Sequence, residues 1–352
     1  MRAAICRDGK MNIGEIEVPQ PGPGQVLVKT RHCGICGSDL HLVHEFEEFA
    51  ELGRRAGIAT GKMQSELPLV PGHEFSAEIV EYGPRAENTL TAGSLICSLP
   101  LVVGEDYGEA LGFSHRFNGG FAEYMLLSES LVIPVTNGLP ADQAALAEPM
   151  AVAAQAIARA ELVDSCIMVI GCGPIGQAII RILKARGIGP IIASDPIAGR
   201  RAAAERLGAD KVVDPTVEDP HESWEEFGLT RGAVSYPRKP VERRPFVFEC
   251  SGAKGILANI INGAPRATRI VIPSIATGLD SIETAMATNK EAELRFCMGY
   301  TADIFRETVE SMCSGELPVA DLIGSSISLD DLPAALDDGA VNGDGGKVLV
   351  SF

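Results

Sequence analysis

The sequence predicts an α/β protein with two domains, one mostly β and barrel-like and one built on a doubly wound parallel sheet. Short β-rich runs separated by Gly and Pro fill residues 1–150, as in a mostly β domain. From residue 151 onward helical and strand patterns alternate, which is typical of βαβ units. The chain has 352 residues, 46% of them hydrophobic, which is enough for two cores.

In the first half the clearest strands are Gln25–Lys29 and Phe75–Tyr82, which are rich in apolar and β-branched residues. Between them, the spacing of apolar residues over Glu45–Arg55 predicts a short amphipathic helix. The second half gives a regular series: the expected helices are Ala151–Ala160, Ile175–Arg186 and Arg200–Leu207, and the expected strands are Cys166–Ile170, Pro190–Ser194, Phe246–Cys250 and Arg269–Pro273.

Two later segments complete the pattern. Asp214–Arg244 is polar and Pro-rich, and it predicts an irregular surface excursion that includes Trp224. The chain then ends with an expected helix, Thr301–Ser314, and a terminal strand, which together are too short for a third core. We therefore expect residues 295–352 to join residues 1–150 in one domain, and residues 151–294 to form the other.

Charge and composition exclude several classes of partner. A net charge of −17 argues against a nucleic-acid or anionic membrane surface, which needs clustered Lys and Arg. The most apolar stretch, residues 166–183, is interrupted by Pro174 and several glycines, and the first residues do not fit a signal peptide. The nine scattered cysteines fit reduced thiols. We expect a cytoplasmic protein without nucleic-acid or membrane partners.

The string Gly171-Cys-Gly-Pro-Ile-Gly176 fits a dinucleotide-binding turn, because it follows an apolar strand and opens a helix. Gly171 permits the tight turn, Gly173 lets the backbone approach a pyrophosphate, and Gly176 allows close helix packing. Pro174 and Ile175 begin the helix whose N-terminus would face the phosphates. An ordinary strand-to-helix turn is the alternative.

Asp195 ends the next expected strand, where a carboxylate can accept hydrogen bonds from an adenosine ribose and would repel a 2′-phosphate. The sequence therefore favours NAD over NADP. Arg200 and Arg201 follow closely and leave NADP open, since an arginine can hold the additional phosphate.

Cys36, His73 and Glu148 can supply a thiolate, an imidazole and a carboxylate to a catalytic Zn²⁺ that keeps its fourth position open. Each also has an ordinary alternative role, as a small buried residue, a turn histidine and a first-turn helix acid respectively. Cys33 and Cys36 form a single C-x-x-C, but no second pair follows to complete a zinc knuckle.

The neighbours of these residues strengthen the zinc interpretation. Asp39 and Glu74 lie beside two of the expected ligands, as carboxylates that orient a metal-bound imidazole do. Ser38 and His41 add a hydroxyl and a titratable base in the same segment. This combination suits the oxidation of an alcohol, which needs a Lewis acid, a hydrogen-bond partner for the alkoxide and a proton acceptor.

These motifs together resemble the zinc-dependent medium-chain dehydrogenase/reductase family, which includes alcohol and sorbitol dehydrogenases. The resemblance covers nearly the whole chain, and the Glu-Pro form of the third ligand is similar to the sorbitol and polyol dehydrogenase branch. It is carried by the glycine string and by Gly34-Ile-Cys-Gly-Ser-Asp-Leu-His41, Pro71-Gly-His-Glu74, Gly119-Gly-Phe-Ala-Glu-Tyr124, Glu148-Pro149 and Lys347-Val-Leu-Val. It implies a GroES-like catalytic domain with a Rossmann domain inserted before the C-terminal return.

By this resemblance, Cys36, His73 and Glu148 would be zinc ligands, and Glu74 would lie behind the metal and approach it transiently. The many relatives with a structural zinc bind it through four clustered cysteines. This chain has no cysteine between Cys97 and Cys166, so we expect one catalytic zinc and no structural zinc.

The resemblance also implies roles for residues near the substrate and cofactor. Ser38 would hydrogen-bond the substrate oxygen, and His41 would pass its proton to solvent through the cofactor ribose. Arg200 would lie near the adenosine ribose, and Lys347 near the pyrophosphate. The implied reaction is reversible hydride transfer between a secondary, polyol or bulky alcohol and NAD, in a homodimer or homotetramer.

Two other functions stay open on the sequence. One is a zinc-free, NADPH-dependent reductase of enones or quinones on the same fold, and the other is a non-catalytic nucleotide-binding protein. The segment between His41 and His73 is longer than is usual in the family and would shape the substrate entrance. His44 on this segment and His115 would face the substrate or lie in solvated loops.

Overall fold

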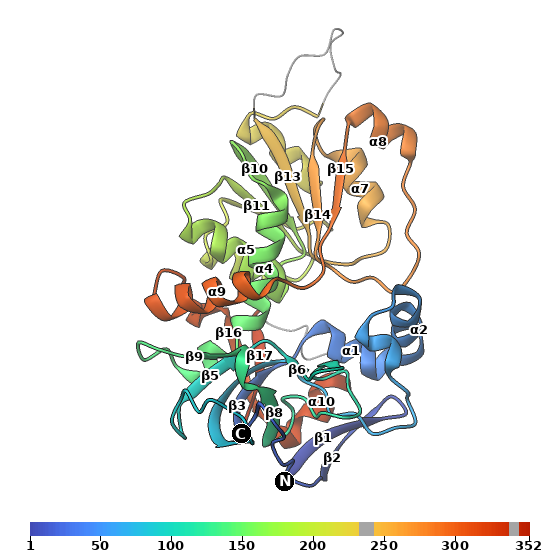
Figure 1. Cartoon of the computed structure of the whole chain (residues 1–352). Helices are drawn as coiled ribbons and strands as arrows, with labels where there is room; N and C mark the ends of the chain where they lie inside the picture. Colours follow the sequence, from blue (N-terminus) through green and yellow to red (C-terminus); the bar gives the residue numbers. More distant parts are fainter. Residues whose placement is uncertain (232–242, 338–344) are drawn as a thin grey trace. The chain divides into compact units, whose positions relative to one another are not determined.

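The computed structural model describes residues 1–231, 243–337 and 345–352 (Figure 1). The described chain forms two compact units. The first contains residues 1–148 together with residues 305–337 and 347–352, and the second contains residues 149–231 and 243–304 with 345 and 346. The α/β fold class that the sequence predicts is confirmed, with one mostly β unit and one that contains a parallel sheet.

The first unit is organised by a seven-stranded sheet of order β16-β17-β3-β4-β5-β9, in which β8 also pairs with β3. All of these pairs are antiparallel except β16 with β17. The strands of the unit are β1 (Arg2–Arg7), β2 (Lys10–Glu15), β3 (Gln25–Gly34), β4 (Glu74–Tyr82), β5 (Leu95–Ser98), β6 (Leu101–Val103), β7 (Gly108–Ala110), β8 (Tyr124–Ser128), β9 (Val132–Pro134), β16 (Ile323–Ser328) and β17 (Lys347–Ser351). Because β17 pairs with β3, the end of the chain returns to this unit.

Two helices, α1 (Gly37–His44) and α2 (Phe46–Ala56), follow β3 almost directly. The helix expected over Glu45–Arg55 is confirmed as α2, whose buried residues Phe46, Phe49, Ala50 and Gly53 recur with helical spacing. Gly57 ends α2 in the left-handed conformation that favours glycine. The other helical segments of this unit are α3 (Ala141–Ala144), α10 (Leu332–Asp337) and the 3-10 turns Ala59–Lys62, Glu129–Leu131, Ala320–Leu322 and Leu329–Asp331.

The second unit contains a six-stranded parallel sheet of order β12-β11-β10-β13-β14-β15 within its described residues. This is the doubly wound order, in which the direction of winding reverses beside the first strand, β10. Every residue of β10 is buried, as a strand covered on both faces requires. Its strands are β10 (Ser165–Ile170), β11 (Ile191–Ser194), β12 (Lys211–Val213), β13 (Arg244–Glu249), β14 (Arg269–Ile272) and β15 (Glu293–Phe296).

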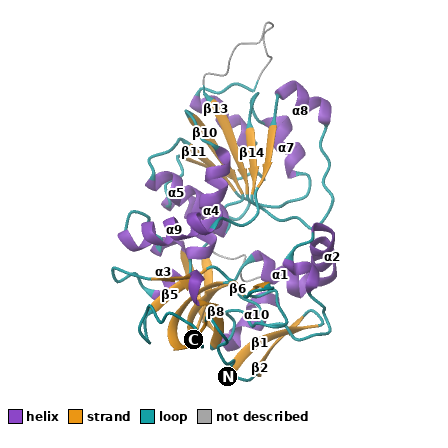
Figure 2. Ribbon diagram, viewed as in Figure 1, coloured by secondary structure: helices purple, strands orange, loops and turns teal. Residues whose placement is uncertain are grey.

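Helices cover the sheet of the second unit (Figure 2). They are α4 (Ala147–Ala160), α5 (Pro174–Ala185), α6 (Ala198–Arg206), α7 (Ile256–Gly263) and α8 (Thr284–Lys290). A boundary between the two units lies within α4 and another within α9 (Ala302–Ser314), which belongs to the first unit from residue 305 onward. Residues from alternate positions of β10 and its neighbours pack against α7 and α8 in one hydrophobic cluster.

The expectation of an irregular surface excursion over Asp214–Arg244 is wrong for its first part. Pro220–Phe227 is a 3-10 helix, and Trp224 is fully buried in the cluster that covers the parallel sheet. The indole accounts for the difference, because its large apolar surface is more stable against the sheet than in water. Residues 232–242 of this expectation lie outside the described residues. No helix in the described parts of the chain is both long enough and apolar enough to cross a membrane.

Candidate metal and cofactor sites

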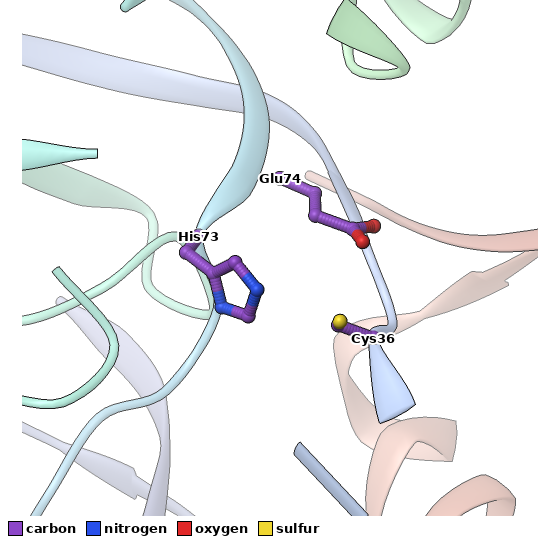
Figure 3. Close-up of side chains that lie close together, drawn as sticks. All are labelled: Cys36, His73 and Glu74. Atoms are coloured by element: carbon purple, nitrogen blue, oxygen red, sulfur yellow. The ribbon is translucent and has the colours of Figure 1, made fainter. Parts of the chain in front are cut away.

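Two neighbouring strands bring Cys36 and His73 together. Gly34 at the end of β3 pairs with Glu74 at the start of β4, so the residues that follow β3 and precede β4 meet at one edge of the sheet. The sulfur of Cys36, a ring nitrogen of His73 and a carboxylate oxygen of Glu74 lie within 4.8 Å of one another. Figure 3 shows that the three side chains point toward one another. A soft sulfur, an imidazole and a carboxylate are ligands that suit Zn²⁺.

Asp39 lies behind the ring of His73. Its Oδ1 atom is 4.0 Å from Nδ1 of His73, and both atoms are buried without a hydrogen-bond partner among the described residues. The other oxygen, Oδ2, accepts a hydrogen bond of 2.9 Å from the backbone N–H of Cys36. Since Nδ1 faces a carboxylate, Nε2 is the nitrogen left for a metal, as in the carboxylate–histidine–metal arrangement of zinc sites.

The field around His73 favours positive charge. Burial lowers the pKa of the imidazole, but the hydrogen bond with Cys36 and the charges of Cys36, Asp39 and Glu148 outweigh burial and raise the pKa to about 10. A site that holds a proton this strongly also favours a divalent cation, because both are stabilised by the same negative groups. The donor set and the unpaired buried atoms therefore fit a zinc ion.

Glu74 is paired with Lys347. The ammonium of Lys347 lies 2.6 Å from Oε1 and 2.5 Å from Oε2 of Glu74, and both residues are buried. A Cβ atom at Gly34 would overlap the Glu74 carboxylate, which explains the glycine at this position. The structure thus joins Glu74 to Lys347, a partner that the sequence did not indicate, and the expected contact of Lys347 with a pyrophosphate stays a prediction.

Glu148 lies in the first turn of α4. Its carboxylate is outside the group of ligand atoms that Cys36, His73 and Glu74 form, yet its charge raises the pKa of His73 and of Lys347. Glu148 therefore contributes negative charge near His73 and Lys347. Its role as the third zinc ligand stays a prediction.

Ser38 and His41 both lie on α1, directly after Cys36. The hydroxyl of Ser38 is buried without a hydrogen-bond partner among the described residues. Nδ1 of His41 lies 2.9 Å from Oε2 of Glu45, and the His41 ring stacks on Phe49 with centroids 5.3 Å apart. The helix α1 thus presents a hydroxyl, an acid and an imidazole within one and a half turns.

A row of aromatic rings leads from His41 to His73. The ring centroids of Phe49 and Phe113 are 6.2 Å apart, and those of Phe113 and His73 are 5.1 Å apart. The sequence did not single out Phe113, because nothing in its local pattern distinguishes it from a core residue. The i, i+4 spacing of His41 and Glu45 was the one signal that could have revealed their pair.

His44 and His115 both have backbone partners. Nε2 of His44 lies 3.1 Å from the carbonyl of Leu336. Nε2 of His115 accepts a hydrogen bond of 2.9 Å from the backbone N–H of Gln64, and Nδ1 lies 3.0 Å from the carbonyl of Pro68. The ring therefore links its own segment to the segment that contains Gln64 and Pro68. These contacts give both histidines structural roles.

The glycine string forms the turn between β10 and α5. Gly171 has a positive φ of 88°, and a Cβ atom at this residue would lie 2.7 Å from the backbone nitrogen of Ser251. A Cβ at Gly176 would overlap the carbonyl of Gly171, so the helix packs closely on the turn. At Gly173, the nearest atom to an added Cβ is in Arg200, 3.9 Å away, so the backbone there borders open space. This arrangement fits a dinucleotide pyrophosphate.

Asp195 supports this turn from the adjacent strand. It is buried, and its carboxylate accepts hydrogen bonds of 2.8 Å from the backbone N–H groups of Cys172 and Ile197. Arg200 lies 3.8 Å from the same carboxylate. Asp195 and Arg200, which the sequence assigns to the adenosine ribose, therefore lie beside the glycine turn that is assigned to the pyrophosphate.

Comparison with known proteins gives matches to both halves of the chain. A model described as the alcohol dehydrogenase GroES-like domain matches residues 22–137, and one described as zinc-binding dehydrogenase matches residues 174–314. The (R,R)-butanediol dehydrogenase of Bacillus subtilis is 32% identical over 342 residues, which are 94% of each chain. The L-threonine 3-dehydrogenase of Pyrococcus furiosus is 32% identical over 215 residues, 58% of each chain.

Solved structures agree with these matches. The crystal structure of a dehydrogenase from Sinorhizobium meliloti 1021, bound to NADP, has a TM-score of 0.82 and 25% sequence identity to this chain. The comparison covers 100% of this chain and 99% of that one. The fold of the described chain is therefore that of a two-unit dehydrogenase.

Proposed function

This chain belongs to the zinc-dependent medium-chain dehydrogenase/reductase family, and we propose that it oxidises an alcohol reversibly with one catalytic Zn²⁺ and NAD. It is an oxidoreductase of the type that acts on alcohols. The observation that carries the proposal is the cluster of Cys36, His73 and Glu74, whose ligand atoms lie within 4.8 Å of one another. A non-catalytic nucleotide-binding protein would not need such a buried set.

In this proposal Cys36, His73 and Glu148 hold the zinc ion, and Glu74 lies behind it, neutralised by Lys347. The negative field that raises the pKa of His73 supports the assignment. Zinc, when bound, is a Lewis acid that favours loss of the proton from an alcohol hydroxyl near neutral pH. The carboxylate of Asp39, whose Oδ1 lies 4.0 Å from Nδ1 of His73, favours the tautomer with the proton on Nδ1 and so leaves Nε2 for the metal.

Two residues of α1 handle the proton. Ser38 accepts a hydrogen bond from the substrate hydroxyl, and its own unpaired, buried hydroxyl supports this role. His41 takes the proton that the hydroxyl releases, as a general base with one basic nitrogen. The alcohol carbon becomes a carbonyl carbon, so one proton and one hydride leave the substrate in each turnover.

The nicotinamide cofactor, when bound, accepts the hydride. Gly173 and the N-terminus of α5 hold its pyrophosphate, Asp195 and Arg200 lie at its adenosine ribose, and Lys347 is assigned to the pyrophosphate. Asp195 favours NAD, since its carboxylate would repel a 2′-phosphate. The S. meliloti relative is bound to NADP, so the cofactor choice of this chain has to be measured separately.

Relatives suggest the substrate class. The names (R,R)-butanediol dehydrogenase and L-threonine 3-dehydrogenase both denote substrates with a secondary hydroxyl. We propose a secondary alcohol here, with a pocket wall formed by Phe113 beside His73. The protein is proposed to act in the cytoplasm as a homodimer or homotetramer, which light scattering on the purified chain would test.

The proposal is tested by turnover of NAD with a panel of secondary alcohols and polyols. Cys36→Ser and His73→Ala should both abolish NADH formation and lower the zinc content. Unchanged turnover in either variant after metal depletion would exclude the mechanism. Oxidation of NADPH by enones or quinones in the zinc-depleted protein would instead identify the zinc-free reductase.

A further inference from the structure

The side chains of His41, Glu45 and Phe49 lie close together where α1 is followed by α2. The backbone N–H of Glu45 donates to the carbonyl of His41 at 2.9 Å, and that of Phe49 donates to the carbonyl of Glu45 at 2.9 Å. Glu45 therefore ends the hydrogen bonds of α1 and begins those of α2, with the non-helical backbone angles φ −139° and ψ 35°. Glu45 follows His41 by four residues at the end of α1, and Phe49 lies in the first turn of α2, so both side chains can reach the His41 ring.

Glu45 and Phe49 each contact the His41 ring. Oε2 of Glu45 lies 2.9 Å from Nδ1 of His41. Phe49 stacks on the ring at 5.3 Å with an angle of 25° between the planes. A carboxylate can only accept a hydrogen bond, so Nδ1 carries the proton and Nε2 is left as the basic nitrogen. The His41 side chain keeps 23% of its surface exposed, so the ring is not closed off.

We propose that α2 positions His41 for proton transfer, with Glu45 as the positioning residue. Glu45 fixes the tautomer and Phe49 fixes the plane of the ring, so that Nε2 is the atom that takes the proton from the substrate hydroxyl through Ser38. The proton that forms the imidazolium comes from the alcohol, and the Glu45 carboxylate stabilises the positive charge. This inference rests on the proposed function, because the task of His41 comes from it.

Other acidic residues of α2 provide a matched comparison. Glu47 accepts a hydrogen bond from the hydroxyl of Ser65 at 3.0 Å, and Glu48 is exposed. If Glu45, which directly precedes α2, served only to solvate the start of the helix, Glu45 and Glu48 would be interchangeable. The geometry at His41 distinguishes them, since the ring contacts Glu45 and Phe49.

The first test measures the tautomer of His41 by NMR in the ¹⁵N-histidine-labelled, zinc-loaded protein. The chain has six histidines, and the His41 signals are assigned by their loss in His41→Gln. We expect the neutral ring to carry its proton on Nδ1 in the wild type, in Glu48→Ala and in Glu45→Gln, whose carbonyl still accepts. In Glu45→Ala the proton should move toward Nε2. An Nε2-protonated ring in the wild type, or no change in Glu45→Ala, would overturn the proposal.

The second test uses a double-mutant cycle in alcohol oxidation. Glu45→Ala should lower kcat roughly tenfold, the effect of losing one hydrogen bond to a charged group, with little change in the KM for the alcohol. Glu48→Ala should leave kcat unchanged, and Glu45→Gln should retain most of it. In the His41→Gln background, Glu45→Ala should have no further effect. Additive losses would overturn the positioning role, whereas a wild type without any alcohol oxidation would refute the proposed function and leave the tautomer result to decide the orientation of the ring.

Discussion

The ammonium of Lys347 lies 2.5 Å from Oε2 of Glu74 and is buried with it directly beside the Cys36 and His73 cluster. Lys347 begins β17 and Glu74 begins β4, so this ion pair links the C-terminal strand to the strand that positions His73. Burial of a single unpaired charge is costly, whereas a complete pair is tolerated. The pair therefore determines whether the metal-binding edge of the sheet is stable.

We predict that Lys347→Met lowers the free energy of unfolding by about 3–5 kcal/mol, because it leaves the Glu74 carboxylate buried without a partner. The double variant Glu74→Gln/Lys347→Met should recover most of this loss. Urea unfolding of both variants measures the difference. A double variant as unstable as Lys347→Met alone would show that the lysine stabilises the fold by packing rather than by its charge.

A second prediction separates the two carboxylates near the metal. Glu148→Gln should lower the zinc content of the purified protein strongly, because we assign it as a ligand. Glu74→Gln should keep about one zinc per chain while it reduces turnover, since its carboxylate is already paired with Lys347. Elemental analysis of both variants after dialysis decides the matter. The opposite order of zinc loss would make Glu74 the ligand.

A third prediction concerns the cofactor. Asp195→Ala should raise the KM for NAD at least tenfold and reduce the preference for NAD over NADP, because the variant loses the ribose acceptor and the repulsion of a 2′-phosphate. It also loses two hydrogen bonds that hold the glycine turn. Values of kcat/KM for both cofactors provide the test. If the ratio of the two values were unchanged, Asp195 would be a structural brace of the turn only.

A fourth prediction follows from His221, whose Nδ1 accepts from the indole N–H of Trp224 while Nε2 faces Asn259. Burial lowers the pKa of His221 below its ordinary value of 6.5, so the folded protein resists its protonation. The unfolded chain binds the proton as the pH falls below 6.5, whereas the folded chain binds it only at lower pH. The stability contributed by neutral His221 is therefore complete above pH 6.5 and is lost progressively below it.

Urea unfolding at pH 7.5 and pH 5.0 measures this effect. The wild type should lose more stability between the two pH values than His221→Gln, which has no titrating ring. The variant itself should be less stable at pH 7.5 by about 1–3 kcal/mol, because the indole N–H loses its acceptor. Equal losses in the two proteins would assign the pH dependence to other groups.

Much of the fold was predictable because its signals are local. The buried strand β10, the glycine turn and the helix α5 follow one another within residues 165–185, so their pattern is continuous in the sequence. The amphipathic helix α2 was predictable for the same reason. Trp224 was placed wrongly, because the polar residues around it resemble a loop and the sheet that buries it is distant in sequence.

The metal cluster was only partly predictable. Cys36 and His73 could be paired because each lies in a motif of its own, and the β3–β4 register brings them together. The contacts of Glu74 with Lys347 and of Phe113 with His73 join residues far apart in the chain, and no spacing rule connects them. Side-chain partners of this kind depend on tertiary packing, which sequence patterns do not encode locally.

The central claim is that one catalytic zinc per chain supports NAD-dependent alcohol oxidation. It is tested most directly by the zinc content per chain of freshly purified protein, measured before and after chelation. NAD reduction is followed on the same samples at ~340 nm, where the reduced nicotinamide absorbs. The account predicts about one zinc per chain and NADH formation from a secondary alcohol that is lost on chelation and returns with added zinc. Alcohol oxidation that continues at the same rate in zinc-free protein would contradict it.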